Sequence, residues 1–186
     1  MKNLLKNQAI SAKKISFTAL FSALCCIGTL VITIPLPNGY FNVGDVFVFL
    51  AGWCLGPIYG TLAAALGSAL ADVISGFTLY APATFFVKGA EALLAYFIWF
   101  LWKKIIKNTK LDVLARGFSA IVGGICMVAG YFFYEWILYG FGGATASLVG
   151  NLIQASCCIV CALCLIAALY PIKGMRKLFP SLMPTE

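Results

Sequence analysis

The chain of 186 residues is 62% hydrophobic and only 10% charged, with a formal net charge of +7 and a mean hydropathy of +0.99. Roughly a quarter of the residues in a soluble domain are charged, so this composition excludes a water-soluble globular fold and predicts a protein solvated by lipid. Nucleic-acid binding is also disfavoured, because the basic residues form short clusters beside apolar segments and no basic, aromatic-rich stripe.

The first apolar segment covers 15–34 and follows a lysine-rich N-terminal stretch. It is too long for the hydrophobic region of a secretory signal and suits a membrane-spanning helix. The run Pro35-Leu36-Pro37-Asn38-Gly39 then predicts a break. The next apolar stretch, 45–75, contains Gly56-Pro57, so it is either one long kinked helix or two short helices that turn there.

Positive charge separates these two topologies, because Lys and Arg favour cytoplasmic loops. With a turn at Gly56-Pro57 there are six spans, and twelve of the thirteen basic residues fall on one side, Lys88 being the exception. We therefore predict an all-α membrane protein, a single six-helix bundle with both termini cytoplasmic. The expected helices are 15–34, 45–56, 57–75, 83–102, 117–138 and 144–170.

In this topology the polar side chains of the spans gather in the outer half of the membrane. They are Asn42, Asp45, Asp72, Lys88, Glu91, Glu135, Asn151 and Gln154. A charge near the bilayer centre costs about 2.5–3.5 kcal/mol on insertion scales, which makes these residues candidates for a site filled from outside. Aromatic residues on the same side suit an interfacial belt or ring stacking.

Several of these residues also have structural interpretations. Asp45 is placed to cap a helix after Gly44. Lys88 and Glu91 have the i, i+3 spacing of an ion pair, and Asp72 is a second possible partner of Lys88. Glu135, Asn151 and Gln154 favour ligand contact, because helix association seldom requires a carboxylate together with two amides.

Catalytic and metal-binding chemistry finds little support in the sequence. The chain has no histidine, and its eight cysteines all fall in apolar segments, where we expect them to pack between helices. This applies to the overlapping CxxC spacings of Cys158, Cys161 and Cys164. No G-x-x-x-x-G-K-[ST] loop is present, so ATP-driven transport would require a partner chain. We expect no catalytic residue, metal or cofactor.

Small residues in the first helix form a possible partner interface. Ala19, Ser22 and Ala23 give a small-xxx-small pattern, which lets another helix approach closely in lipid.

The chain resembles the substrate-binding S components of energy-coupling factor (ECF) vitamin transporters over Ser16 to Tyr170. The motifs that carry this resemblance are Thr18-Ala-Leu-Phe-Ser-Ala-Leu24, Asn42-Val-Gly-Asp45, Gly56-Pro57, Gly67-Ser-Ala-Leu-Ala-Asp72, Tyr80-Ala-Pro-Ala-Thr84, Lys88-Gly89 and Gly150-Asn-Leu-Ile-Gln154. The resemblance implies a six-helix fold, capture of a vitamin or its precursor, and residence in the bacterial plasma membrane. It also implies a coupling membrane subunit, contacted through the Ala19/Ala23 face, and two ATPase subunits.

Members for hydroxymethylpyrimidine or vitamin B6 are the most similar in appearance, and riboflavin carriers are more loosely similar. The hypothesis is thus a non-enzymatic binding subunit for a small pyridine or pyrimidine ring. Its expected contacts are Asn42, Asp72, Tyr80, Lys88, Glu135, Trp136, Asn151 and Gln154, with Tyr80 and Trp136 as stacking residues. The alternatives are a riboflavin S component, a self-sufficient secondary transporter, and an intramembrane enzyme or structural protein.

Overall fold

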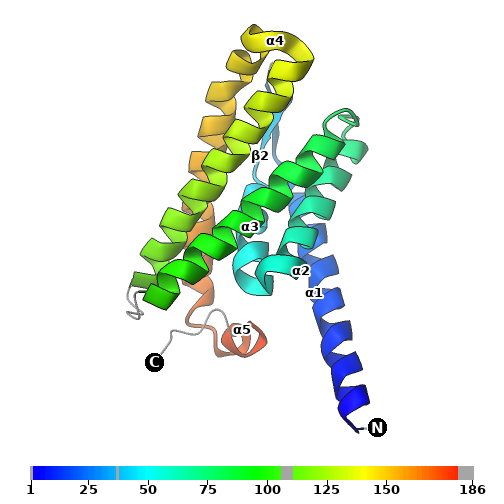
Figure 1. Cartoon of the computed structure of the whole chain (residues 1–186), viewed down its shortest axis with the longest axis vertical. Helices are drawn as coiled ribbons and strands as arrows, with labels where there is room; N and C mark the ends of the chain where they lie inside the picture. Colours follow the sequence, from blue (N-terminus) through cyan, green and yellow to red (C-terminus); the bar gives the residue numbers. More distant parts are fainter. Residues whose placement is uncertain (1, 37, 106–110, 180–186) are drawn as a thin grey trace.

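The computed structural model describes residues 2–36, 38–105 and 111–179 and is nearly all helical (Figure 1). Its elements are α1 (Lys2–Val31), β1 (Thr33–Pro35), β2 (Tyr40–Asn42), α2 (Asp45–Ile74), α3 (Ala81–Ile105), α4 (Asp112–Leu169) and α5 (Lys173–Leu178). Within the described ranges four helices are long and apolar enough to span a membrane, namely Ala12–Val31, Asp45–Ile74, Ala81–Ile105 and Asp112–Leu169.

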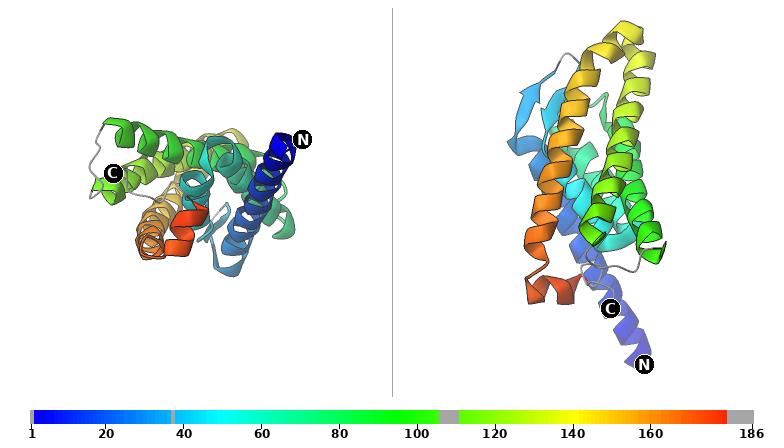
Figure 2. Two further views of the ribbon diagram at one scale, coloured as in Figure 1. Left: turned by 90° about the horizontal axis from the view of Figure 1, so that it is seen from below. Right: turned by 90° about the vertical axis from the view of Figure 1, so that its left-hand side faces the viewer.

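Two of these long helices are interrupted by a glycine. Gly56 in α2 has φ 83° and Gly140 in α4 has φ 74°, the left-handed region that glycine enters without steric cost. At each glycine the chain turns back, and Figure 2 shows the two limbs of α4 side by side. The limbs of α2 pack so closely that a Cβ on Gly60 would lie 2.4 Å from the Ala51 carbonyl oxygen.

The ends of several elements differ from the sequence-based boundaries. α1 ends at Val31, so the expected helix through Ile34 is corrected, because Thr33–Pro35 instead pairs antiparallel with Tyr40–Asn42. The Leu36 amide donates to the Gly39 carbonyl at 2.8 Å and closes this hairpin. The short helix α5 was not anticipated either.

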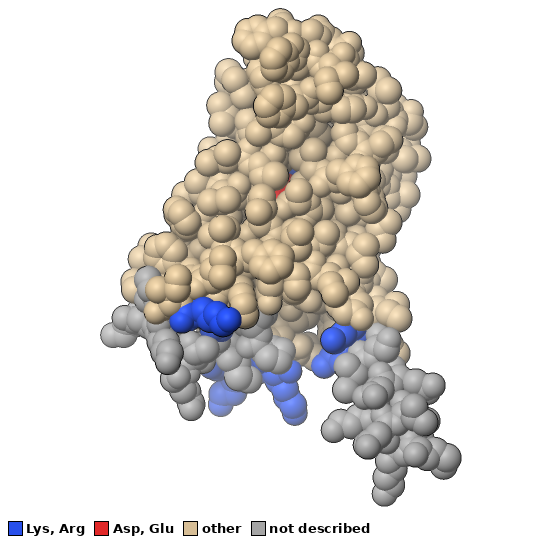
Figure 3. All heavy atoms as spheres, viewed as in Figure 1, with Lys and Arg blue, Asp and Glu red and all other residues tan. Residues whose placement is uncertain are grey.

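The residues on the bundle surface are mostly large and apolar. Ile137 is 84% exposed and Phe86 is 72% exposed, whereas Trp53 and Phe49 are fully buried in the core. Monomeric soluble proteins rarely expose apolar area on this scale, and a lipid solvent accounts for it. Lys and Arg side chains gather at one end of the molecule, where α1 begins and α5 lies (Figures 1 and 3).

Candidate functional site

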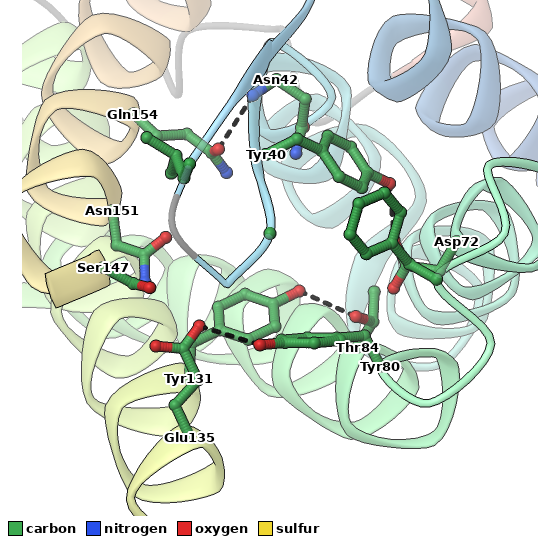
Figure 4. A pocket seen from close by; sticks show the side chains of 13 residues that line it. Tyr40, Asn42, Asp72, Tyr80, Thr84, Tyr131, Glu135, Ser147, Asn151 and Gln154 are labelled. Atoms are coloured by element: carbon green, nitrogen blue, oxygen red, sulfur yellow. Dashed lines mark hydrogen bonds between the residues drawn. The ribbon is translucent and has the colours of Figure 1, made fainter. Parts of the chain in front are cut away.

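A polar cavity lies in the half of the bundle away from the basic end. With its open mouth included, its volume is about 440 Å³. The β1–β2 hairpin, the end of α2, the start of α3 and both limbs of α4 contribute side chains to it (Figure 4). The lining residues are Leu36, Gly39, Tyr40, Asn42, Asp72, Phe77, Tyr80, Thr84, Tyr131, Glu135, Ser147, Asn151 and Gln154.

The β1–β2 hairpin forms one wall of the cavity and is attached to α4 at two points. The Asn42 backbone N–H donates to Gln154 Oε1 at 2.9 Å, and Asn38 Nδ2 donates to the Gly143 carbonyl at 2.7 Å. The Asn42 side chain is occupied locally, since its Oδ1 accepts from the Gly44 N–H at 3.0 Å. The hairpin is therefore positioned by hydrogen bonds to residues more than a hundred positions along the chain.

Two carboxylates on different helices line the cavity. Tyr40 Oη donates to Asp72 Oδ1 at 2.6 Å, and Tyr80 Oη lies 3.3 Å from Glu135 Oε1. The second oxygens, Asp72 Oδ2 and Glu135 Oε2, are buried and accept no hydrogen bond of good geometry from the described residues. The Thr84 hydroxyl lies close enough to interact with Asp72, and the Ser147 hydroxyl and the Asn38 amide lie close enough to interact with Glu135. Buried polar atoms are almost always satisfied in folded proteins, so these oxygens indicate a place for donor groups of a ligand.

The phenol of Tyr40 lies outside the long helices, in β2. Burial, together with its hydrogen bond to Asp72, raises the pKa of Tyr40 well above its usual range. The phenol therefore keeps its proton at physiological pH and remains a donor to the Asp72 carboxylate.

Hydroxyl and amide groups complete the wall. Thr84 Oγ1 and Tyr131 Oη are 3.0 Å apart, and the Asn151 amide lies beside Ser147 at the cavity (Figure 4). Amide side chains offer both donors and acceptors, and hydroxyls do the same. The cavity can therefore bind a compact molecule that carries polar substituents on several edges.

A buried cluster of charges lies beneath this cavity. Lys88 Nζ pairs with Asp45 and with Glu91, the latter at 3.3 Å, and none of the three side chains is more than 3% exposed. Gln154 connects the cluster to the hairpin, since its Nε2 donates to Asp45 Oδ2 at 2.8 Å while its Oε1 accepts from Asn42.

These contacts decide between the structural interpretations that the sequence left open. The expected helix cap by Asp45 is wrong, because Gly44 occupies the cap position of α2 and the Asp45 carboxylate forms an ion pair with Lys88 instead. The expected pair of Lys88 and Glu91 is confirmed. In the described part of the chain Lys88 pairs with Asp45 and Glu91 and makes no ion pair with Asp72.

Six of the eight residues expected to contact substrate line the cavity, namely Asn42, Asp72, Tyr80, Glu135, Asn151 and Gln154. Lys88 lies below it in the ion cluster. Trp136 is 47% exposed and stacks on Phe133, with ring centroids 6.3 Å apart, so it does not line the cavity.

The sequence-based set of site residues omitted Tyr40, Thr84, Tyr131 and Ser147. Thr84 follows Tyr80 by one helical turn, and Tyr131 precedes Glu135 by one turn, so i, i+4 spacing from the two expected residues was the available signal. The expected partner residues Ala19, Ser22 and Ala23 line a different hollow, an apolar groove between α1 and α2 whose volume, with its open mouth included, is about 900 Å³.

Comparison with known proteins places this architecture in a family. The family model described as "ECF-type riboflavin transporter, S component" matches residues 9–171. A Pyrococcus woesei protein, described as an uncharacterized protein in gap 3' region, is 37% identical over 131 residues, which cover 69% of this chain and 82% of that protein. The "Thiamine precursor transporter HmpT" of Lactococcus lactis subsp. cremoris (strain MG1363) is 26% identical over 145 residues, 76% of this chain and 78% of that protein.

The family match spans nearly all of the helical bundle, from within α1 to just beyond the end of α4. Members of this family are transporter components and not enzymes. The chain is a multi-pass protein of the cell membrane, and it belongs to the family of ECF-type riboflavin transporter S components.

Proposed function

We propose that this chain is the substrate-specific subunit of an ECF-type ABC importer and captures a small pyridoxine- or hydroxymethylpyrimidine-like ring at the outer face of the membrane. The observation that carries the proposal is the pair of cavity carboxylates, Asp72 and Glu135, whose second oxygens accept no hydrogen bond of good geometry from the described residues. A ring with amino or hydroxyl substituents supplies the donors that these oxygens require.

The side chains of the lining suit a single ring with polar substituents. Apart from Leu36, Gly39 and Phe77, every lining residue carries a hydroxyl, amide or carboxylate group. Such a ring can form hydrogen bonds on most of its edges while its faces contact the tyrosine and phenylalanine rings. The relative named as a thiamine precursor transporter supports the smaller ligand.

Riboflavin is the second candidate ligand, since the matching family is described by it. Tyr80 and Phe77 offer aromatic surface on one side of the cavity, with ring centroids 6.3 Å apart. A larger ligand would require the β1–β2 hairpin to move away from α4, which would break the Asn42–Gln154 and Asn38–Gly143 hydrogen bonds.

The proposed topology has six crossings, with both termini cytoplasmic and the cavity outside. The turns at Gly56 and Gly140 support this count, because they divide α2 and α4 into two limbs each. The basic end seen in Figure 3 would face the cytoplasm by the positive-inside tendency. Lys88 would then act from below the cavity by holding Asp45, which in turn accepts from Gln154.

The proposed partners are an ECF coupling membrane subunit and two ATPase subunits. The groove beside Ala19, Ser22 and Ala23 supports this assignment, because its other wall is apolar and includes Leu62, Leu66 and Leu70. Small residues facing leucines accept a packed helix in lipid. Uptake by cells should stop when the ATPase subunits are deleted; uptake that persists would favour a secondary transporter.

Ligand binding by the purified full chain in detergent tests the proposal. Isothermal titration calorimetry should show that hydroxymethylpyrimidine or pyridoxine binds at micromolar concentration or tighter. Glu135→Gln should weaken binding about tenfold to a hundredfold, as expected for a lost hydrogen bond to a charged group. Ser156→Ala, which removes an exposed hydroxyl of α4 that bonds the Leu152 carbonyl and does not line the cavity, is the control and should bind normally.

The experiment tests the identity of the ligand and the role of the chain as a binding subunit separately. If riboflavin alone binds, the single-ring assignment is wrong and the binding-subunit assignment stands. If no member of a panel of B-group vitamins and their precursors binds at micromolar concentration, the proposed function is overturned.

A further inference from the structure

A second hollow opens at the basic end of the molecule, between α1, the turn of α2 at Gly56, and α5. With its mouth included, its volume is about 760 Å³. Its walls are largely apolar and include Phe17, Leu55 and Tyr59, and Phe179, only 4% exposed, also lines it. It is separate from the polar cavity, with which it shares no lining residue.

Three lysines surround this apolar hollow. Lys13 and Lys14 come from α1 and Lys177 from α5, and all three are exposed. Among the described residues none of them forms an ion pair. The ammonium groups of Lys13 and Lys14 instead lie 5.8 Å and 5.3 Å from the ring centres of Phe17 and Tyr59.

The acidic side chains of the described ranges are engaged elsewhere and do not pair with this cluster. Asp45, Asp72, Glu91 and Glu135 belong to the polar cavity and the ion cluster beneath it, while Asp112 is held by Arg116 at 2.8 Å. The hollow therefore combines an apolar interior with positive charge at its mouth that no acidic side chain of the described residues pairs with. Basic pockets between helices at a membrane surface bind acidic lipid head groups by this combination.

We propose that this hollow binds an acidic phospholipid from the membrane leaflet at the basic end. The phosphate would lie among Lys13, Lys14 and Lys177, and an acyl chain would pack against Phe17 and Tyr59. A zwitterionic lipid matches the walls but not the net charge, and a soluble phosphate matches the charge but leaves the apolar walls unused. The bound lipid would join α5 to α1, which come from opposite ends of the sequence. This inference does not depend on the proposed function.

Native mass spectrometry of the full chain, released from detergent and titrated with lipid, tests the assignment. We expect dioleoylphosphatidylglycerol to bind at about tenfold lower concentration than dioleoylphosphatidylcholine. The triple variant Lys13→Gln/Lys14→Gln/Lys177→Gln should lose that preference. The matched control, Lys103→Gln/Lys104→Gln/Lys173→Gln, removes the same charge from the same end without altering the lining and should keep it.

Two further measurements separate the apolar walls from the charged mouth. Leu178→Trp leaves every lysine in place and fills the hollow from a side chain that is 42% exposed; it should also abolish the preference. Glycerol 1-phosphate at the concentration of the lipid should not displace it. The proposal is overturned if the two lipids bind equally to the unaltered protein, if the control triple variant loses as much binding as the test variant, if Leu178→Trp binds normally, or if glycerol 1-phosphate competes.

Discussion

The two ends of the bundle bury charged side chains in opposite ways. At the basic end Arg116 is fully buried, its Nε donates to Asp112 at 2.8 Å and to Tyr170 Oη at 3.2 Å, and its guanidinium lies 4.2 Å from the centre of the Trp99 ring. In the cavity, Asp72 and Glu135 are also buried, but one oxygen of each accepts no hydrogen bond of good geometry from the described residues.

This difference suggests that the buried charge at the basic end stabilises the fold, whereas the buried charges at the cavity serve ligand binding. A buried charge is costly unless hydrogen bonds and an opposite charge compensate it. The Arg116 guanidinium has an opposite charge, Asp112, beside it and lies over the rings of Trp53 and Trp99, so its expected contribution is to stability. Asp72 and Glu135 face the cavity and form no ion pair with a described residue, so their expected contribution is to the molecule that fills the cavity.

Removing the basic-end charge should have the largest effect on stability. Arg116→Met leaves Asp112, which is 12% exposed, without its partner, and breaking a buried ion pair in this way costs about 3–5 kcal/mol. Thermal unfolding in detergent should show the loss. Ligand affinity of the protein that remains folded should be unchanged; a large drop in affinity would mean that the two ends are coupled.

Removing a cavity charge should produce the reverse pattern. Asp72→Asn keeps the shape of the side chain and removes a charge that forms no ion pair with a described residue. We expect ligand affinity to fall by about 2 kcal/mol and the free energy of unfolding of the empty protein to change by less than about 1 kcal/mol. Calorimetry gives the first value and thermal unfolding without ligand gives the second. A stability loss as large as that of Arg116→Met would contradict the comparison.

The sequence predicted the helical class and singled out several polar residues that lie together in the structure. Lipid-exposed helices contain few polar side chains, so Asp72, Glu135 and Asn151 were conspicuous against an apolar background. The predicted topology, derived from basic residues and helix breakers, assigned them to one half of the membrane. The structure brings these three side chains to the lining of one cavity.

The parts that were not predicted depend on local geometry. The β1–β2 hairpin was treated as a loop, although Asn38-Gly39 between β-branched and aromatic residues is a hairpin signal. Trp136 was assigned to the site as a stacking residue because it belongs to the aromatic residues of the same half. Adjacent residues on a helix project about 100° apart, so Trp136 points away from the cavity that its neighbour Glu135 lines, and its ring packs on Phe133. Hydrophobic periodicity gives little help in lipid, since both faces of a helix are apolar.

The Tyr40–Asp72 hydrogen bond should have an intermediate effect with a distinctive pH dependence. Tyr40→Phe removes a 2.6 Å bond to a carboxylate, which costs about 1.5–3 kcal/mol. Because the pKa of Tyr40 is raised by burial and by Asp72, the folded state holds the phenol proton more tightly than the unfolded state does. Its stabilisation is therefore complete at neutral pH and is lost only as the pH rises above about 10, where the unfolded phenol ionises.

Unfolding of the unaltered protein and of Tyr40→Phe, measured from pH 6 to pH 11, checks this expectation. The difference in stability between the two should be constant below about pH 9 and should shrink above about pH 10. A difference that already shrinks near neutral pH would show that Tyr40 ionises readily and is not held by Asp72.

The smallest effect is expected at the connection that joins the two cavity helices. Gly76 links α2 to α3, has φ 83°, and has open space where a Cβ would lie. Gly76→Ala therefore introduces only backbone strain, which costs about 1 kcal/mol. Gly142 is the matched control, because it also has open space but is helical, and alanine there should be neutral or stabilising. Thermal unfolding of the two variants should give shifts of opposite sign. If both alanine variants raise the unfolding temperature, the connection between Asp72 and Tyr80 accepts a side chain without backbone strain. The two helices that carry these cavity residues would then be held less rigidly than we infer.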